Sequence, residues 1–148
     1  MRRILLLVGL ALFVGAVPTA AAAAVNATIE VHSPFSGDGG TFTADSAALC
    51  PAGTTSDVTS ITGNGAVLNI TNFKTFTCSD GSGTFTLRIQ AHVRPCEATD
   101  WGAWSVVRGT GDYVSLRGAG TLIGTYFPNN ACDAEGIDDV LTGVLVLR

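Results

Sequence analysis

Eight short segments of β-forming residues, separated by turn residues, constrain this chain more than any other feature. In the clearest segment, residues 84–94, apolar residues occupy the odd-numbered positions and polar residues the even-numbered ones. Because side chains alternate between the two faces of a strand, this pattern predicts a sheet with one apolar and one polar face. No segment after residue 24 has the apolar spacing of an amphipathic helix. The expected strands are residues 28–33, 40–47, 55–62, 66–77, 83–94, 102–109, 118–126 and 138–147.

The order and spacing of these strands favour an all-β fold, an eight-stranded antiparallel up-and-down barrel. Most links between the strands are short and contain glycine, asparagine or aspartate, which suits hairpins between sequence neighbours. Closing such a sheet into a barrel removes the exposed strand edges that invite aggregation. The alternative all-β fold is a β-sandwich of two smaller sheets.

Four cysteines allow three disulfide pairings. In an up-and-down barrel, Cys50 and Cys78 follow strands that finish at one end, and Cys96 and Cys132 follow strands that finish at the other. The barrel therefore predicts the disulfides Cys50–Cys78 and Cys96–Cys132, each stabilising the fold by about 2–4 kcal/mol. Disulfides persist in oxidising compartments, and the absence of a Cys-x-x-Cys pair argues against a zinc or redox site.

The first 24 residues are expected to be a signal peptide. Arg2 and Arg3 precede an uncharged apolar run at residues 4–17, and alanines at 20–24 offer a cleavage site. The alternative, a membrane anchor, needs about 20 apolar residues, and Pro18 interrupts this run too early. We therefore expect cleavage near Ala22 or Ala24, and a single secreted, extracellular domain over residues 25–148.

The composition of this domain restricts its partners. Without the leader it carries six Lys or Arg residues against twelve Asp or Glu residues, a net charge of −6, and Lys74 is its only lysine. Nucleic-acid binding depends on basic residues that neutralise phosphates. We therefore expect no nucleic-acid partner and, after cleavage of the leader, no membrane partner.

A glycine-rich stretch at residues 109–122 resembles the G-x-G-x-[YF]-x-x-[LIA]-x-G-x-G stretch of dirigent and allene-oxide-cyclase-like β-barrels, and of small secreted actinobacterial proteins of unknown function. The residues that carry the resemblance are Gly109, Gly111, Tyr113, Leu116, Gly118 and Gly120. The resemblance implies a strand, a short turn whose aromatic and leucine side chains plug the barrel end, and the next strand.

The same resemblance implies two kinds of pocket. A cyclase implies a largely apolar cavity for a reactive lipid epoxide, and a dirigent protein implies a pocket for a radical pair with carboxylates at its mouth. No catalytic residue is transferred, because the matching motif builds a turn. Fold alone does not determine which activity, if any, such a barrel has.

Five residues are candidates for ligand binding. Trp101 and Trp104 are able to stack on a sugar or an aromatic ligand at a barrel mouth, although such residues commonly pack in a core or cap an end. Arg88 and His92 share the polar face of one strand, which is either a binding face or ordinary solvent-exposed surface. Tyr113 lies in the expected turn at the barrel end.

The sequence contains no signal for a catalytic residue, a metal site or a cofactor. The two histidines are far apart in the chain, and no nucleotide-binding or hydrolase motif is present. The acidic stretch at residues 133–139 lacks the twelve-residue calcium-loop pattern, so a solvated loop is expected there.

Three classes of function remain open. A secreted barrel that binds a small apolar or aromatic ligand predicts an interior cavity. A protein-interaction or inhibitory module predicts a filled barrel that acts through loops such as 95–102 and 126–139. A cyclase- or isomerase-like enzyme predicts polar groups that point into a cavity beside an open mouth. The expected cavity-lining residues are Phe85, Leu87, Ile89, Trp104 and Val106.

Overall fold

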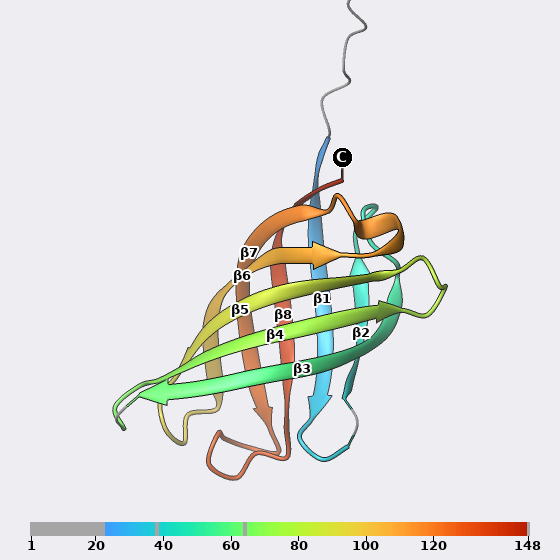
Figure 1. The fold of residues 1–148 in the computed structure, drawn as a ribbon. Coiled ribbons are helices and arrows are strands. Elements are labelled where there is room, and N and C mark those ends of the chain that lie inside the picture. The colour runs from blue at the N-terminus through green and yellow to red at the C-terminus, as the bar shows by residue number, and fades with distance from the viewer. Residues whose placement is uncertain (1–22, 38, 64, 148) are drawn as a thin grey trace, which may run out of the picture.

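The computed structural model describes residues 23–37, 39–63 and 65–147. Eight antiparallel strands follow one another in chain order around a closed barrel (Figure 1). The predicted eight-stranded up-and-down barrel is therefore confirmed, and the alternative β-sandwich is not formed. The strands are β1 (Ala24–Pro34), β2 (Gly40–Asp45), β3 (Ala52–Gly63), β4 (Leu68–Cys78), β5 (Thr84–Val93), β6 (Thr99–Gly109), β7 (Arg117–Phe127) and β8 (Gly136–Val146).

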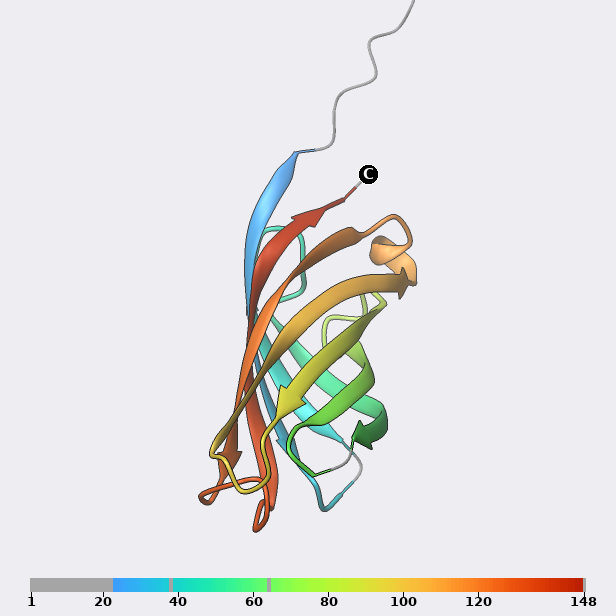
Figure 2. The ribbon, with the colours of Figure 1, turned by 90° about the vertical axis from the view of Figure 1, so that its left-hand side faces the viewer.

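Pairing of the first and last strands closes the barrel. The β1–β8 ladder runs from Ala24 opposite Val146 to Pro34 opposite Gly136. Each described strand therefore has a hydrogen-bonded neighbour on both sides. Strands on opposite sides of the barrel cross at a large angle. In Figure 1, β3, β4 and β5 are nearly horizontal, while β1 and β8 are nearly vertical. Figure 2 shows the same barrel from the side.

Both predicted disulfides are present, one at each end of the barrel. Cys50 lies in the loop after β2, and Cys78 is the last residue of β4. Their Cα atoms are 5.9 Å apart. Cys96 and Cys132 lie in the loops after β5 and β7, and their Cα atoms are 4.7 Å apart. Two disulfides fit an extracellular or otherwise oxidising environment.

The expected signal peptide overlaps only slightly with the described chain. Residues 1–22 lie outside the described residues, and β1 already begins at Ala24. Among the residues that the structure describes, no helix is long and apolar enough to cross a membrane.

Aromatic side chains fill the end of the barrel where β2, β4 and β6 finish, which we call the closed end. Phe76 and Phe85 stack with their ring centroids 4.6 Å apart, and Phe42 meets both rings edge-on. Tyr113 packs against Phe85 at 5.4 Å, and Leu116 is completely buried beside this cluster. These side chains form a packed core at the closed end.

The glycine-rich stretch builds the turn that carries this plug. A 3₁₀ turn, η1 (Gly111–Tyr113), connects β6 to β7. Gly111 has a φ of 58°, which glycine adopts without steric cost. A side chain at Gly109 would meet the carbonyl oxygen of Tyr113 at 2.1 Å. The strand–turn–strand arrangement is therefore present, while a relationship to dirigent or allene-oxide-cyclase-like barrels stays a prediction.

Tyr113→Phe tests how much the plug depends on a polar contact. The Cys50 N–H donates a buried hydrogen bond of 2.9 Å to the Tyr113 hydroxyl, and the substitution leaves this N–H without that partner. We expect the free energy of unfolding to fall by about 1–3 kcal/mol, measured by urea denaturation with both disulfides intact. Val114→Ala, in the same turn and 69% exposed, should change it by less than about 0.5 kcal/mol. Equal losses in the two variants would contradict this role.

Candidate binding site at the open end of the barrel

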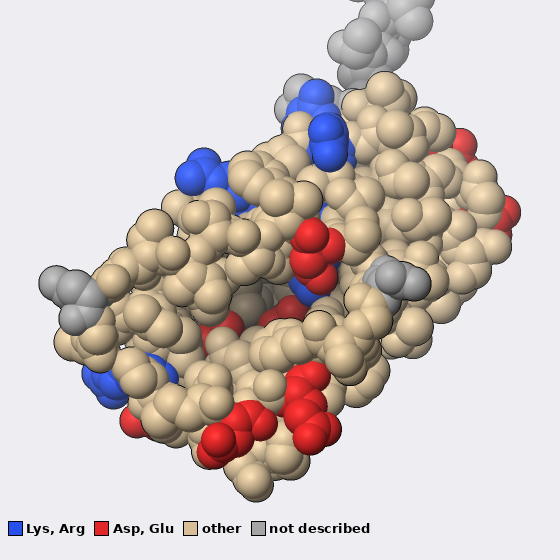
Figure 3. Space-filling view, turned by 60° about the horizontal axis from the view of Figure 1, so that its bottom comes forward, with Lys and Arg blue, Asp and Glu red and all other residues tan. Residues whose placement is uncertain are grey.

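The barrel interior opens to solvent at the end opposite the plug, which we call the open end. Figure 3 shows a hollow there, with carboxyl groups inside it and around its rim. The cavity has a volume of about 540 Å³. Its lining includes Lys74, which lies two residues before Phe76 on the inner face of β4, and extends to loop residues such as Phe35 and Ala131. A space of this size is typical of pockets for small ligands.

Aliphatic side chains from β3, β4, β5, β7 and β8 form a large part of the cavity wall. Ile61 lies on the cavity side of β3 and yet keeps 60% of its surface exposed. Covering such an apolar surface with a ligand is favourable by about 25 cal/mol per Å². The aliphatic lining residues are Ile61, Leu68, Ile70, Ile89, Ala91, Val93, Leu122 and Ile137.

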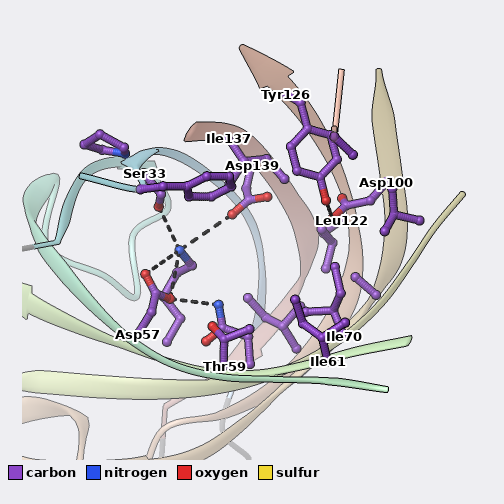
Figure 4. Close-up of a pocket in the computed structure, with 18 of the residues that line it drawn as sticks. Ser33, Asp57, Thr59, Ile61, Ile70, Asp100, Leu122, Tyr126, Ile137 and Asp139 are labelled. Atoms are coloured by element: carbon purple, nitrogen blue, oxygen red, sulfur yellow. Dashed lines mark hydrogen bonds and ion pairs between the residues drawn. The ribbon is translucent and has the colours of Figure 1, made fainter. Parts of the chain in front are cut away.

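Lys74 is a buried cation that faces this cavity, with only 1% of its surface exposed. Its Nζ donates a hydrogen bond of 2.8 Å to Ser33 Oγ and lies 3.0 Å from Asp57 Oδ1 (Figure 4). The distance from Nζ to Asp139 Oδ2 is longer, 3.7 Å. Asn72 also donates a hydrogen bond to Asp57, at 2.8 Å. These partners offset the cost of removing the ammonium group from water.

Asp100 is a buried carboxyl group that forms no ion pair with any described residue. It accepts hydrogen bonds from the Gly124 N–H at 3.1 Å and from the Tyr126 hydroxyl at 3.2 Å. Burial raises the pKa of Asp100, although these two hydrogen bonds and the charge of Lys74 oppose the shift. Burial and the nearby Asp100 charge also raise the pKa of Tyr126, so its hydroxyl stays protonated and donates.

Asp139 is the third carboxyl group of the cavity and is 5% exposed. Burial raises its pKa to about 6; the Lys74 charge opposes this shift, and the Asp100 and Asp57 charges add to it. Asp100 and Asp139 converge on Gly124, where an added Cβ atom would lie 2.4 Å and 2.8 Å from their respective Oδ1 atoms. The absence of a side chain at Gly124 therefore gives the two carboxyl groups the space they occupy.

These groups form what we call the polar cluster: Lys74, Asp57, Asp100, Asp139 and Tyr126. Its three carboxyl groups and one amine give a net charge of −2 when all four ionise. A carboxyl group that titrates near neutral pH is suited to exchanging a proton with a ligand. The cluster therefore places an excess of negative charge beside the aliphatic wall, which provides hydrophobic contact.

The only cluster with metal-ligand spacing among the described residues lies elsewhere. It consists of Cys50, Cys78 and Asp80. Both sulfur atoms are joined in a disulfide, so they are not available as thiolate ligands.

None of the five sequence-predicted ligand residues lines the cavity, and two of them lie in the packed interior. Trp104 is 2% exposed, and its Nε1–H donates a hydrogen bond of 3.1 Å to the Thr121 carbonyl. Tyr113 belongs to the plug at the closed end. A side chain at Gly143 would meet Cζ2 of Trp104 at 2.5 Å, so this glycine makes room for the indole ring.

The other three residues lie on the outer face of the barrel. Arg88 and His92 are exposed on β5, as the polar face of that strand predicts. His92 contacts Asn69 through Nδ1 at 2.8 Å, and its ring centroid is 6.3 Å from that of Trp101. Trp101 is 45% exposed. The structure thus brings His92 and Trp101 together, but outside the cavity.

Of the five residues expected to line an interior cavity, only Ile89 does so. Phe85, Leu87 and Trp104 belong to the packed core, and Val106 is partly buried against it. The interior is therefore filled toward the closed end and open at the other end.

The sequence analysis did not identify Lys74, Asp100 or Asp139. Asp139 falls both in the acidic stretch at residues 133–139, where a solvated loop is expected, and in the expected strand at residues 138–147. The structure begins β8 at Gly136 and directs Asp139 inward, on the same face as Leu141. Strand alternation contains the missing signal, because Lys74 is two residues from buried Phe76 and therefore shares its face.

Comparisons with protein-family models, curated proteins and solved structures found no match to this chain. Any assignment to a family therefore depends on the glycine-rich stretch at residues 109–122 and stays a prediction.

Asp139→Asn tests the burial of this carboxyl group through the pH dependence of stability. Because the pKa is raised from 3.8 to about 6, the folded protein holds the proton more tightly than the unfolded chain does. The free energy of unfolding of wild type minus that of Asp139→Asn should be largest below about pH 4. It should fall by about 3 kcal/mol as the pH rises through 6. Urea denaturation at several pH values measures this difference.

The control for this prediction is Asp112→Asn, an exposed carboxyl group in η1 at the closed end. We expect its stability difference from wild type to show no such decline. A pH-independent difference for Asp139→Asn would mean that the Asp139 carboxyl group is solvated.

Proposed function

We propose that the protein binds a small ligand with an apolar or aromatic body inside the open end of the barrel. The observation that carries this proposal is the cavity of about 540 Å³ with its aliphatic wall. Pockets for small molecules have volumes of about 300–1,000 Å³ and mostly apolar linings with a few polar groups. The cavity and its polar cluster have this composition.

We further propose that the chain is exported and acts outside the cell. The leader at residues 1–24 and the two disulfides support this location. The resemblance to dirigent and allene-oxide-cyclase-like barrels is consistent with an internal ligand site. A filled interaction module is less favoured, because the open half of the barrel is hollow.

A matched pair of variants on β3 tests the site with little risk to folding. Ile61 and Val58 are 60% and 73% exposed, but only Ile61 lines the cavity. Nile red, a neutral aromatic dye whose fluorescence rises in apolar surroundings, serves as the probe. We expect Ile61→Asp to weaken Nile red binding about tenfold, because it places a charge in the apolar wall. Val58→Asp is the control and should leave binding unchanged.

Two results would contradict the proposal. Wild type that does not bind Nile red in a fluorescence titration would argue against an accessible apolar cavity. Equal effects of the two variants would place the dye on the outer surface.

A cyclase- or isomerase-like enzyme is a second candidate, favoured by one observation. Asp139 has a pKa of about 6 and lies close to Asp100, whose partner is the Tyr126 hydroxyl. Carboxyl groups that titrate near the working pH are effective in general acid–base catalysis. A ligand recovered chemically changed after incubation would support this candidate, provided that Asp139→Asn abolishes the conversion and still binds. Recovery of an unchanged ligand would support binding alone.

A further inference from the structure

We propose that the ligand of this cavity is an amphipathic amine, whose ammonium group binds between Asp100 and Asp139 and whose apolar body lies on the aliphatic wall. This inference rests on the proposed function and specifies the class of ligand. It follows from the charge balance of the polar cluster, from the convergence of two carboxyl groups and from the arrangement of the cavity walls.

The single cation of the cluster is already engaged by its nearest partners. Lys74 Nζ lies 2.8 Å from Ser33 Oγ and 3.0 Å from Asp57 Oδ1, whereas its distance to Asp139 is 3.7 Å. The partners of Asp100 are the uncharged Gly124 N–H and Tyr126 hydroxyl. Among the described residues, Asp100 therefore has no ion pair, and Asp139 has only the longer one to Lys74.

These two carboxyl groups lie near one another. An added Cβ atom at Gly124 would lie 2.4 Å from Asp100 Oδ1 and 2.8 Å from Asp139 Oδ1. Each charge disfavours ionisation of its neighbour, and Asp100 contributes to the raised pKa of Asp139. An ammonium group that contacts both carboxylates would replace this repulsion by attraction and by charge-assisted hydrogen bonds.

The opposite wall of the cavity suits the rest of such a ligand. Asp139 lies on β8 and Ile70 on β4, which are on opposite sides of the eight-stranded ring. Figure 4 shows Ile61 and Ile70 across the cavity from Asp139. A ligand that contacts both walls therefore needs a cationic group at one end and an apolar body at the other.

The entrance to the cavity also favours a cation. Glu97, Asp133 and Glu135 are exposed in the two loops of the open end that Cys96–Cys132 connects. Phe35 and Tyr126 both line the cavity, with their rings edge-to-face at 6.5 Å. Acidic rims attract cations, and aromatic faces stabilise them at close range. An anionic ligand would meet the same carboxylates and be repelled.

Three probes with one aromatic body test the inference: naphthylmethylamine, naphthylmethanol and naphthoic acid. Calorimetric titration at neutral pH should show that the amine binds wild type at least about tenfold more tightly than the alcohol, and that the acid binds most weakly. Asp100→Asn and Asp139→Asn should each weaken amine binding about tenfold and change alcohol binding by less than about twofold.

Asp138→Asn is the matched control, because Asp138 lies beside Asp139 on β8 but is exposed and contacts His32 at 2.6 Å outside the cavity. Its affinity for all three probes should equal that of wild type. A loss of amine binding in this variant as large as in Asp139→Asn would show that general surface charge attracts the amine, and would overturn the inference.

The pH dependence provides a readout that a purely structural role would not produce. The ionisable groups that face Asp139 are Lys74, Asp57 and Asp100, together with the Tyr126 hydroxyl. From about pH 7 to about pH 5 the probe amine stays charged while Asp139 takes up a proton. The ratio of amine affinity to alcohol affinity should therefore fall several-fold over this pH range. A constant ratio would exclude Asp139 from amine binding.

The outcomes separate this inference from the function on which it rests. If the alcohol binds as tightly as the amine, the cavity binds ligands but does not select amines, and only the inference fails. If naphthoic acid binds best, Lys74 recognises an anion and the inference is again overturned. If neither these probes nor Nile red binds wild type, both the proposed function and the inference fail.

Discussion

Closure of the sheet between β1 and β8 is the constraint on which the other properties of this protein depend. Because every described strand is hydrogen-bonded on both sides, each residue faces either the interior or the exterior. The interior of an eight-stranded barrel is just wide enough for side chains to fill it. The size of a few inward residues at each level therefore decides between a packed core and a cavity. Phe42, Phe76 and Phe85 fill the closed end, whereas the described residues of the open end surround a cavity.

Stability alone does not account for the polar cluster. Replacing a buried ion pair with well-packed hydrophobic residues is commonly neutral or stabilising. Asp139, with a pKa raised to about 6, reduces the stability of the folded protein at neutral pH. Aliphatic side chains in place of Lys74, Asp57 and Asp139 together would extend the packed core without this cost, whereas replacing Lys74 alone would remove the cation that compensates the two carboxyl groups. Buried groups that reduce stability at a cavity are typical of functional sites.

Much of the fold follows from local patterns in the sequence, but the site does not. Alternation in residues 84–94 identifies β5, and the order of strands determines which cysteines share an end. The polar cluster combines β3, β4, β6, β7 and β8. Alternation places Lys74 and Asp139 inside the barrel, but only the register of several ladders places them at the same level. The convergence of Asp100 and Asp139 further depends on the missing side chain of Gly124.

Lys74 links the two halves of the barrel. It extends from β4 to Ser33 on β1, Asp57 on β3 and Asp139 on β8, so its contacts cross the interior between the plug and the cavity. The ammonium group keeps Asp57 close and leaves Asp139 only partly compensated. This unequal pairing gives the cavity its negative character, because Lys74 compensates one carboxylate closely and the other two carboxyl groups face the cavity. If Lys74 contacted Asp139 as closely as Asp57, the cavity would attract a cation less strongly, although the apolar wall of the cavity would be unchanged.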